Sequence, residues 1–292
     1  MTNGTTITKI TTIGQACDYT TRTRSTWRSG PGSRTAAINS GHVIEHLGRS
    51  FPVARINQAC VSQLTLDLEE RGLSSSTINR IISALSTILN HCHFDGLIAQ
   101  PCKFRRLKEG EHRLTWYTKD EVEQMSCAAV DPFDRLDLSH IIPVAGYTGM
   151  RMSELLNLRV LDVDLGADHI HVGGRPGFQT KARNYRCLPI HDRIRDIFSS
   201  RMSNVGPNVK IFGDEWNDKD QLLRAFKKVR DYVGKDESYV FHSLRHSFCT
   251  WLAEGGVPIR TIMDLAGHKQ ITTTLRYAKT TDKARIDAMG AI

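Results

Sequence analysis

The apolar residues between Ser76 and Cys92 recur at steps of three and four, and this pattern constrains the fold more than any other. They are Ile78, Ile81, Ile82, Leu85, Ile88 and Leu89. Such spacing gathers apolar side chains on one face of an α-helix, which must then be buried against neighbours. The hydroxyls of residues 74–77 can cap its first turn, and Gly72 can end a preceding helix. The segment therefore predicts a helix within a helical bundle.

The rest of the first hundred residues repeats this pattern more weakly. Arg34–Leu47 and Gln58–Glu70 carry apolar residues at helical spacing. The Thr-rich start, Met1–Ile10, predicts no more than a polar first helix or a short tail, and no convincing helix is predicted before Arg34. We therefore expect a small all-α domain over residues 1–105. The charged segment that follows, 106–114, has almost no apolar periodicity and predicts a solvated linker.

Residues 115–292 mix helical and strand patterns. Helical spacing recurs in Glu121–Ala129, Leu136–Tyr147, Ser153–Leu158, Asp192–Met202, Asp220–Val233, His242–Glu254, Ile259–Ala266 and Thr272–Tyr277. Alternating or β-branched residues between Gly-rich turns predict strands at Val160–Leu165, His169–Val172 and Arg186–Ile190. The expected fold class is therefore mainly α with a small antiparallel β-sheet (α+β).

The positive charge is concentrated in the first part of the chain. The 292 residues carry a formal net charge of +8, and residues 1–110 hold 13 Lys and Arg against 7 Asp and Glu, a net +6. A basic domain favours a polyanionic partner, because Lys and Arg displace counterions from a phosphate backbone. Many basic proteins never contact nucleic acid, so charge alone does not decide the partner.

The seven cysteines show no C-x-x-C spacing, so we expect reduced, mostly buried thiols and no metal site. No apolar run approaches the roughly 20 residues that cross a bilayer, and the Thr-rich start lacks the apolar core of a secretory signal. These features favour a cytoplasmic protein that acts away from membranes.

Arg151 lies in a glycine-bearing turn at the predicted start of a helix, within Tyr147–Leu158. Free backbone N–H groups and the helix dipole favour an anion there. Glu154, three residues later, can orient the arginine from the same helical face. A capped surface helix with an ordinary salt pair has the same appearance. A second segment, 179–183, places Lys181 and Arg183 in the turn before a strand, where most lysines are merely solvated.

His242 and Arg245 are three residues apart on a predicted helix and share one face. An arginine can hold two phosphate oxygens through its planar guanidinium, and an imidazole can move protons near neutral pH. His246 is expected to point away from this face, and Leu244 into the core. The H-x-x-R pattern is common by chance and is weak evidence alone.

The segment 265–278 places Gly267 as a helix stop, His268 just beyond it and Tyr277 near the end of the next helix. A tyrosine in such a position is usually a packing residue. The evidence changes when the four segments are read in order. Together they provide two arginines, a lysine, two histidines and a tyrosine, namely Arg151, Lys181, His242, Arg245, His268 and Tyr277.

This ordered set resembles the tyrosine recombinases, also called the phage integrase family. The similar segments are T-G-M-R-M-S-E-L-L-N-L, T-K before R-C-L-P-I, H-S-L-R-H, and L-A-G-H-K-Q-I-T-T-T-L-R-Y, which span about residues 115–280. No departure occurs at the six positions. The resemblance implies a catalytic domain over residues 115–292 and a core-type DNA-binding domain over residues 1–105. It implies no separate arm-binding domain, which is common in larger integrases.

The resemblance also implies a mechanism for cutting and rejoining DNA. Arg151, Arg245 and His268 would hold the scissile phosphate, and Tyr277 would attack it to form a 3′-phosphotyrosyl link. His242 would accept the tyrosine proton and Lys181 would protonate the leaving 5′-oxygen, with Glu154 supporting the arginine. No metal, ATP or other cofactor is expected, since the arginines neutralise the charge and the covalent link conserves the phosphodiester energy.

The expected partners are double-stranded DNA attachment sites, a homotetramer on that DNA, and an accessory DNA-bending or directionality factor. The tail from Lys279 to Ile292 would dock on a neighbouring protomer. Arg105, Arg106 and Arg183 are candidate DNA contacts. The favoured function is phage-type integration or excision of a mobile or viral genome. The alternatives are a Xer-type or integron-type recombinase, a type IB topoisomerase, and a non-catalytic DNA-binding relative.

Overall fold

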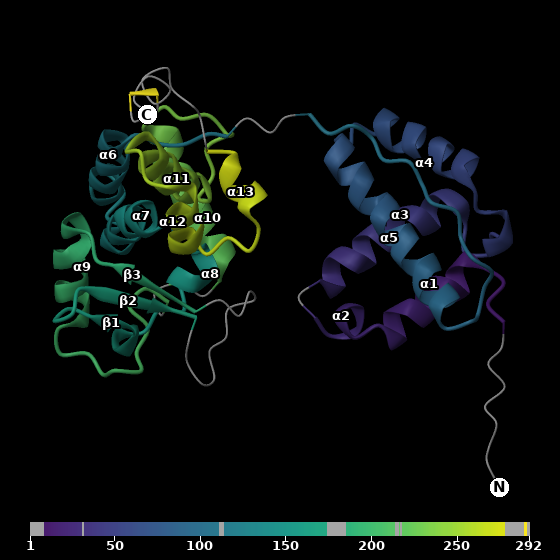
Figure 1. Cartoon of the computed structure of the whole chain (residues 1–292), viewed down its shortest axis with the longest axis horizontal. Helices are drawn as coiled ribbons and strands as arrows, with labels where there is room; N and C mark the ends of the chain where they lie inside the picture. Colours follow the sequence, from purple (N-terminus) through teal and green to yellow (C-terminus); the bar gives the residue numbers. More distant parts are fainter. Residues whose placement is uncertain are drawn as a thin grey trace, which may run out of the picture. The chain divides into compact units, whose positions relative to one another are not determined.

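The computed structural model describes residues 9–30, 32–110, 114–173, 185–213, 216, 218–277 and 289–290. The chain divides into two compact units, Met1–His112 and Arg113–Ile292. The first is helical, and the second combines helices with a three-stranded antiparallel sheet (Figure 1). This confirms the predicted fold class. No helix in the described part of the chain is long and apolar enough to cross a membrane.

The described part of the first unit is a bundle of α-helices with one short 3-10 turn. The helices are α1 (Ile13–Thr23), α2 (Ser25–Arg28), α3 (Ser33–Leu47), α4 (Gln58–Glu70) and α5 (Ser75–Phe94). Helix α5 contacts α1, α3 and α4 and contributes most of the core. Its apolar face is fully buried, as at Ile81, Leu85 and Ile88, and the Ser74 hydroxyl caps its N-terminus. The strongest pattern in the sequence therefore forms the centre of this unit.

Helix α1 lies where the sequence predicted no convincing helix. Thr12 begins it with a capping box, in which its side chain accepts from the Gln15 backbone and the Gln15 side chain accepts in return. Ile13 and Ala16 are fully buried against the bundle, and the Thr20 hydroxyl contacts the Cys92 thiol at 3.7 Å. The helix is difficult to detect from sequence because small and polar residues make up much of its buried face.

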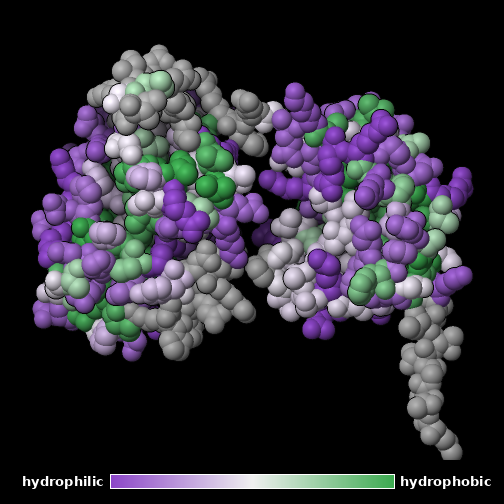
Figure 2. Space-filling view, viewed as in Figure 1, coloured by the Kyte–Doolittle hydropathy of each residue, from purple (hydrophilic) through white to green (hydrophobic). Residues whose placement is uncertain are grey.

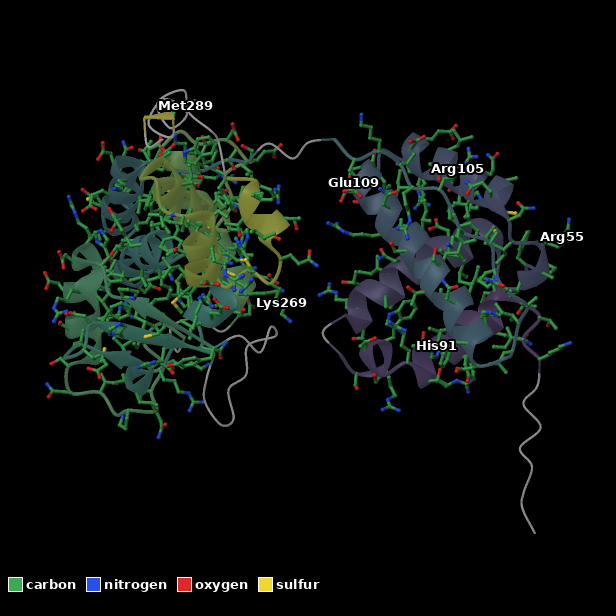
Figure 3. The ribbon with its side chains drawn as sticks, viewed as in Figure 1. Arg55, His91, Arg105, Glu109, Lys269 and Met289 are labelled. Carbon is green, nitrogen blue, oxygen red and sulfur yellow. The ribbon has the colours of Figure 1, made fainter. Side chains whose placement is uncertain are left out.

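The segment after α5 differs from a freely solvated linker. Asn79 of α5 donates to the Leu107 carbonyl at 2.9 Å and to the Glu109 carboxylate at 2.8 Å, and it accepts from the Leu107 N–H at 2.9 Å. Arg106 donates to the Asn79 carbonyl at 2.6 Å. Residues 106–109 therefore pack on the first unit. The labels of Arg105 and Glu109 locate this segment in Figure 3.

The second unit contains the larger core. Its helices are α6 (Lys119–Val130), α7 (Leu136–Thr148), α8 (Met152–Leu155), α9 (Asp192–Met202), α10 (Lys219–Tyr232), α11 (Ser243–Glu254), α12 (Ile259–Ala266) and α13 (Ile271–Leu275). Helix α7 packs against α6, α9, α10 and α11, and its inner residues are buried. Tyr117, Ile141 and Phe198 are completely buried in this core. The helix α7 ends at Gly149, which adopts a left-handed conformation.

The sheet consists of β1 (Val163–Asp164), β2 (His169–Val172) and β3 (Arg186–Pro189), in that order and antiparallel. Ile170 pairs with Leu188, and Val172 pairs with Arg186. Ile170, Val172 and Leu188 are buried, so one face of the sheet joins the core of the unit. The register also brings Arg186, at the first position of β3, into a buried environment.

All seven cysteines are free thiols. Only Cys17, Cys92 and Cys249 are buried, while Cys102, Cys127 and Cys187 are exposed, so the expectation of mostly buried thiols is wrong. The exposed positions are on a loop, a helix and a strand, where the side chain faces away from the core. The surface in Figure 2 is largely hydrophilic on both units, with smaller apolar areas between the polar side chains.

Candidate active site

Arg151 follows the tight turn between α7 and α8. Gly149 has a φ of 60°, and a Cβ there would lie 2.4 Å from the Phe248 ring, so only glycine fits this turn. Arg151 is the N-terminal cap residue of α8, and its side chain is about one-third exposed. The guanidinium donates to Glu154 at 3.0 Å and to the Gly267 carbonyl at 3.1 Å. These two bonds fix its direction from opposite sides.

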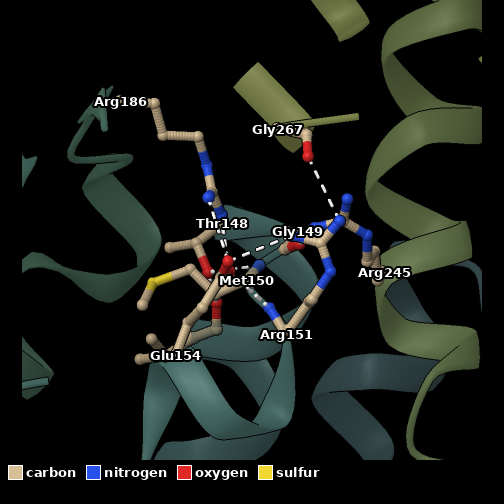
Figure 4. Close-up of polar contacts among 9 residues, drawn as sticks. Thr148, Gly149, Met150, Arg151, Glu154, Arg186, Arg245 and Gly267 are labelled. Carbon is tan, nitrogen blue, oxygen red and sulfur yellow. Dashed lines mark hydrogen bonds and ion pairs between the residues drawn. The ribbon is translucent and has the colours of Figure 1, made fainter. Parts of the chain in front are cut away.

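Glu154 lies at the centre of a buried ion cluster (Figure 4). Its carboxylate accepts from the Arg151 backbone at 2.9 Å and from Arg186 at 2.7 and 3.2 Å. Burial alone would raise the pKa of this carboxyl, but the hydrogen bonds and charge of Arg186, together with Arg151, lower the pKa to about 2. Glu154 is therefore an anion that holds two arginines.

Arg186 was not singled out in the sequence, where it was only the first residue of a predicted strand. Its side chain is 7% exposed and bonds to Glu154 through both terminal nitrogens. Gly267, with a φ of 68°, lies so close that a Cβ there would be 2.8 Å from Arg186 Nη1. The signal that could have found it is an arginine at a core-facing position of a predicted strand, because a buried charge needs a partner.

Arg245 lies within α11 and is 2% exposed. Its Nη1 donates to the Gly149 carbonyl at 2.6 Å, whereas its buried Nη2 has no hydrogen-bond partner among the described residues. Burial, followed by the charge of Arg151, lowers the pKa of Arg245 to about 10, so the side chain remains cationic at neutral pH. A buried cation with an unused donor provides a binding position for an anion.

His268 follows the left-handed Gly267 that ends α12. It is 8% exposed, and its Nδ1 lies 2.9 Å from the Thr274 hydroxyl, which orients the ring. The pKa of His268 is lowered to about 4 by burial and by the charges of Arg245 and Arg151. The two charges lower this pKa because the turn between α12 and α13, which carries His268, lies beside both arginines.

Tyr277 comes directly after α13 and is 6% exposed. Its ring is parallel to that of His268, with an interplanar angle of 5° and centroids 6.4 Å apart. Burial raises the pKa of the Tyr277 phenol, and Cys249 acts in the same direction. The residue therefore combines a protected hydroxyl with a position beside His268.

The hydroxyl of Tyr277 lies 2.5 Å from Nδ1 of His246. The expectation that His246 points elsewhere is therefore wrong. His246 is one helical turn after His242, and residues four apart share a helix face. The imidazoles of the two histidines meet edge to face, with centroids 5.0 Å apart. The i, i+4 spacing was visible in the sequence, but the contact with a tyrosine 31 residues later was not.

His242 precedes α11 as its N-terminal cap residue and is exposed. Partial desolvation, followed by the charges of Arg245 and Arg151, lowers the pKa of its imidazole, which favours the neutral form. The structure thus brings together Arg151, Arg245, His242, His268 and Tyr277. Lys181 and Arg183 lie outside the described residues.

The arrangement provides a compact cationic site beside a hydroxyl nucleophile. Glu154 pairs with Arg151 and Arg186, and Arg245 adds a third cation, so the site keeps an excess of positive charge for an incoming anion. Arg186 and Arg245 each keep a buried guanidinium N–H without a partner among the described residues, and the buried phenol of Tyr277 lies beside His246 and His268. A site of this kind can stabilise negative charge that develops on a phosphoryl group during nucleophilic attack.

Comparisons with known proteins agree with this geometry. Residues 115–284 match the model of the phage integrase family. A tyrosine recombinase of Thermosipho africanus is 27% identical over 228 residues, which cover 76% of this chain and 78% of that protein. Tyrosine recombinase XerA of Thermococcus kodakarensis is 31% identical over 221 residues, which cover 73% and 74%.

A solved structure has the same fold. It is the Tn1549 transposon integrase in complex with a circular intermediate DNA, with a TM-score of 0.76 and 18% sequence identity. The superposition covers 97% of this chain and 100% of that chain. At this level of identity, the similarity concerns the fold.

Proposed function

Since the chain belongs to the phage integrase family of tyrosine recombinases, which cleave and rejoin DNA at specific sites, we propose that it integrates or excises a mobile or viral genome. The proposed reaction passes through a covalent link between DNA and Tyr277. The observation that supports this site most strongly is the buried Arg245 guanidinium with its unused N–H, close to the buried phenol of Tyr277.

The proposed substrate atom is the phosphorus of a DNA phosphodiester. Attack requires stabilisation of the negative charge that accumulates on its non-bridging oxygens. Arg151 and Arg245 provide two fixed cations for those oxygens, and His268 provides a third donor through the ring nitrogen that is not bonded to Thr274. Glu154 and Arg186 keep Arg151 in position without contacting the DNA.

The proposed first step forms a bond between Tyr277 Oη and phosphorus while the bond from phosphorus to the 5′-oxygen breaks. His242 takes the phenol proton, and Lys181 gives a proton to the leaving 5′-oxygen. The products are a 3′-phosphotyrosine and a free 5′-hydroxyl. In the second step a 5′-hydroxyl from another strand attacks the phosphotyrosine and releases the phenol. The phosphodiester energy is conserved, so no ATP is needed.

The proposed partner is double-stranded DNA bound by both units. The net charge of +6 over residues 1–110 supports a core-type DNA-binding role for the first unit. The fold shared with the Tn1549 integrase, which was solved with a circular intermediate DNA, supports the same partner. We further propose that four protomers act together, with an accessory factor setting direction. The tail proposed to dock on a neighbour, residues 279–292, lies almost entirely outside the described residues.

A second candidate is resolution of chromosome dimers by a Xer-type recombinase. It is favoured by the similarity of the chain to tyrosine recombinase XerA of Thermococcus kodakarensis. The two candidates use the same chemistry and differ in the DNA site. They are therefore separated by the choice of substrate and not by mutation of the active site.

The test uses nicked suicide duplexes, from which a short fragment diffuses away after cleavage and traps the covalent complex. One duplex carries the candidate attachment site from DNA flanking the gene, and another carries a chromosomal dimer-resolution site. Wild type and Tyr277→Phe are incubated with each in EDTA, and denaturant-resistant protein–DNA adducts are measured. We expect an adduct with wild type only, on the attachment-site duplex.

Each outcome has a defined meaning. An adduct confined to the dimer-resolution duplex would replace integration with the Xer-type function. An adduct that persists in Tyr277→Phe would show that another residue is the nucleophile. Specific DNA binding without an adduct, even with cell extract added to supply an accessory factor, would favour a non-catalytic DNA-binding protein. Relaxation of supercoiled DNA without strand exchange would indicate a topoisomerase.

A further inference from the structure

His246 makes the closest polar contact to the hydroxyl of Tyr277. The distance from His246 Nδ1 to Tyr277 Oη is 2.5 Å, and the ring centroids are 5.8 Å apart at an angle of 41°. The ring of His268 lies parallel to the tyrosine ring, and Cys249 lies near enough to the phenol to raise its pKa. The nucleophile is therefore held by one residue at its hydroxyl and by others around its ring.

The direction of this hydrogen bond follows from the charges around it. Burial, then the charges of His242, Arg276 and Arg245, lowers the pKa of His246 to about 4, so the imidazole is neutral at pH 7. Burial raises the pKa of the Tyr277 phenol, so this group keeps its proton. With both groups neutral, we assign the imidazole tautomer that carries its proton on Nε2, in which the phenol donates and Nδ1 of His246 accepts.

The position of His246 in the chain links the nucleophile to the phosphate site. His246 follows Arg245 directly on α11, and Arg245 donates to the Gly149 carbonyl at 2.6 Å. One rigid helix thus carries both a cation of the anion site and the acceptor for the phenol. A phenol can turn about two side-chain torsions, and attack on phosphorus requires a narrow range of both.

We propose that His246 is a positioning residue that sets the hydroxyl of Tyr277 relative to the phosphate bound at Arg245, through the hydrogen bond accepted by Nδ1. This rests on the proposed function of the site. His246 is not the residue that accepts the proton of Tyr277 in the proposed mechanism, since that residue is His242. The pKa of His246 is lowered to about 4, and such a histidine is a weak base for a phenol. His246 keeps the nucleophile oriented until His242 takes the proton.

Two substitutions separate the hydrogen bond from packing. His246→Asn keeps an acceptor near the position of Nδ1 but reduces the volume, and it cannot act as a base. His246→Leu keeps much of the volume but has no acceptor. Single-turnover cleavage of the suicide duplex is measured at saturating enzyme, where DNA affinity does not limit the rate. Melting temperatures check that both variants are folded.

We expect His246→Leu to cleave about 10- to 100-fold more slowly than wild type, which is the scale for a misplaced reacting group. His246→Asn should remain within about 5-fold of wild type, and its cleavage should keep the pH profile of wild type, because the residue acts without titrating. Rescue by Asn is the decisive result, since loss of packing alone would make Asn the poorer variant.

Other results would overturn the proposal. Wild-type rates in both variants would show that the hydrogen bond has no role, and a faster Leu variant than Asn would show that packing dominates. Equal loss in both, with an altered pH profile, would make His246 a base. If wild type itself forms no adduct, the proposed function fails first. In that case the ring ¹⁵N shifts of His246 in wild type and Tyr277→Phe still test the hydrogen bond, because an unchanged Nδ1 shift would refute it.

Discussion

The two units bury different kinds of polar side chain. Among the described residues of the first unit, the buried polar ones are Thr20, Ser40 and Asn79, which are all neutral. In the second unit the described residues include buried ionic ones, among them Glu154, Arg186, Arg230 and Arg245. The first unit is held by an apolar helix packed among others, while the second also contains charge placed within a folded core.

This difference indicates which unit contains the active site. Burying a charge costs several kcal/mol unless it is paired and hydrogen-bonded. Arg230 has such partners in Asp231 and the Tyr239 carbonyl and can be explained by structure alone. Arg245 keeps a buried N–H without a partner among the described residues, and an incoming anion would satisfy it. Buried charge with an unused donor is therefore better evidence for a site than buried charge as such.

The contrast between the two units would be wrong if the ion cluster around Glu154 contributed nothing to the unfolding free energy of the second unit. Glu154→Gln removes the carboxylate between Arg151 and Arg186 and leaves the buried Arg186 without a counter-charge. We expect a loss of about 3 to 5 kcal/mol in the unfolding free energy of the second unit. Chemical denaturation with a probe in each unit measures it. Asp264→Asn is the matched control.

Asp264 forms an exposed ion pair with Arg260 at 3.4 Å, and the two side chains are 61% and 74% exposed. Its loss should change stability by less than about 1 kcal/mol, since water screens such pairs. Equal effects of Glu154→Gln and Asp264→Asn would show that burial does not distinguish the cluster. The first unit should remain unaffected in both variants.

Arg245→Met tests whether the buried Arg245 serves activity or stability, because the two are expected to change in different ways. The change keeps most of the volume and removes a buried, incompletely paired cation. We expect cleavage to fall by about 10²- to 10³-fold, or roughly 3 to 4 kcal/mol of activation free energy. The melting temperature of the second unit should stay the same or rise. A large loss of stability together with activity would make Arg245 a structural residue.

The sequence patterns predicted the helices far better than the contacts of the site. Helices α9 and α12 have the bounds that the apolar spacing indicated, because each buries one regular face. Helix α1 was not expected, since its buried face includes Thr20 and small residues. Arg186 and His246 were missed because their partners, Glu154 and Tyr277, lie on other elements, 32 and 31 residues away. Local periodicity indicates which face is buried, but it does not identify the partner.

Acid should unfold the second unit before the first. The pKa values of His246 and His268 are lowered to about 4, so the fold binds their protons less readily than the unfolded chain does. Their stabilising effect is therefore complete above about pH 6.5 and is lost as the pH falls towards 4. We expect a loss on the order of 1 to 3 kcal/mol for each imidazole. Denaturation between pH 7.5 and 4.5 measures it.

A matched variant assigns this pH dependence to its source. His246→Asn removes one of the histidines whose pKa is lowered in the fold, so its stability should decline less steeply than that of wild type over the same range. An unchanged slope would show that His246 titrates normally in the fold. Equal slopes in the two units would remove the proposed difference between them, since the buried ionic residues lie in the second unit.

The smallest effect separates two neighbouring arginines of the first unit. Both arginines are exposed, but Arg106 donates to the Asn79 carbonyl, whereas within the described residues Arg105 bonds only through its backbone N–H, to Gln58 at 2.9 Å. We expect Arg105→Ala to reduce the salt dependence of DNA binding by about one counterion, because it would contact phosphate. Affinity measured at several salt concentrations gives this slope.

Arg106→Ala is the matched control, since it removes the same charge from the adjacent residue. We expect it to lower the stability of the first unit by about 1 kcal/mol and to change the salt slope less than Arg105→Ala does. Equal slopes would show that the charge of this segment acts as a whole and not through one contact. A larger slope change in Arg106→Ala would show that this side chain leaves Asn79 to bind DNA. The first unit would then also keep a donor ready for an anion, as Arg245 does in the second.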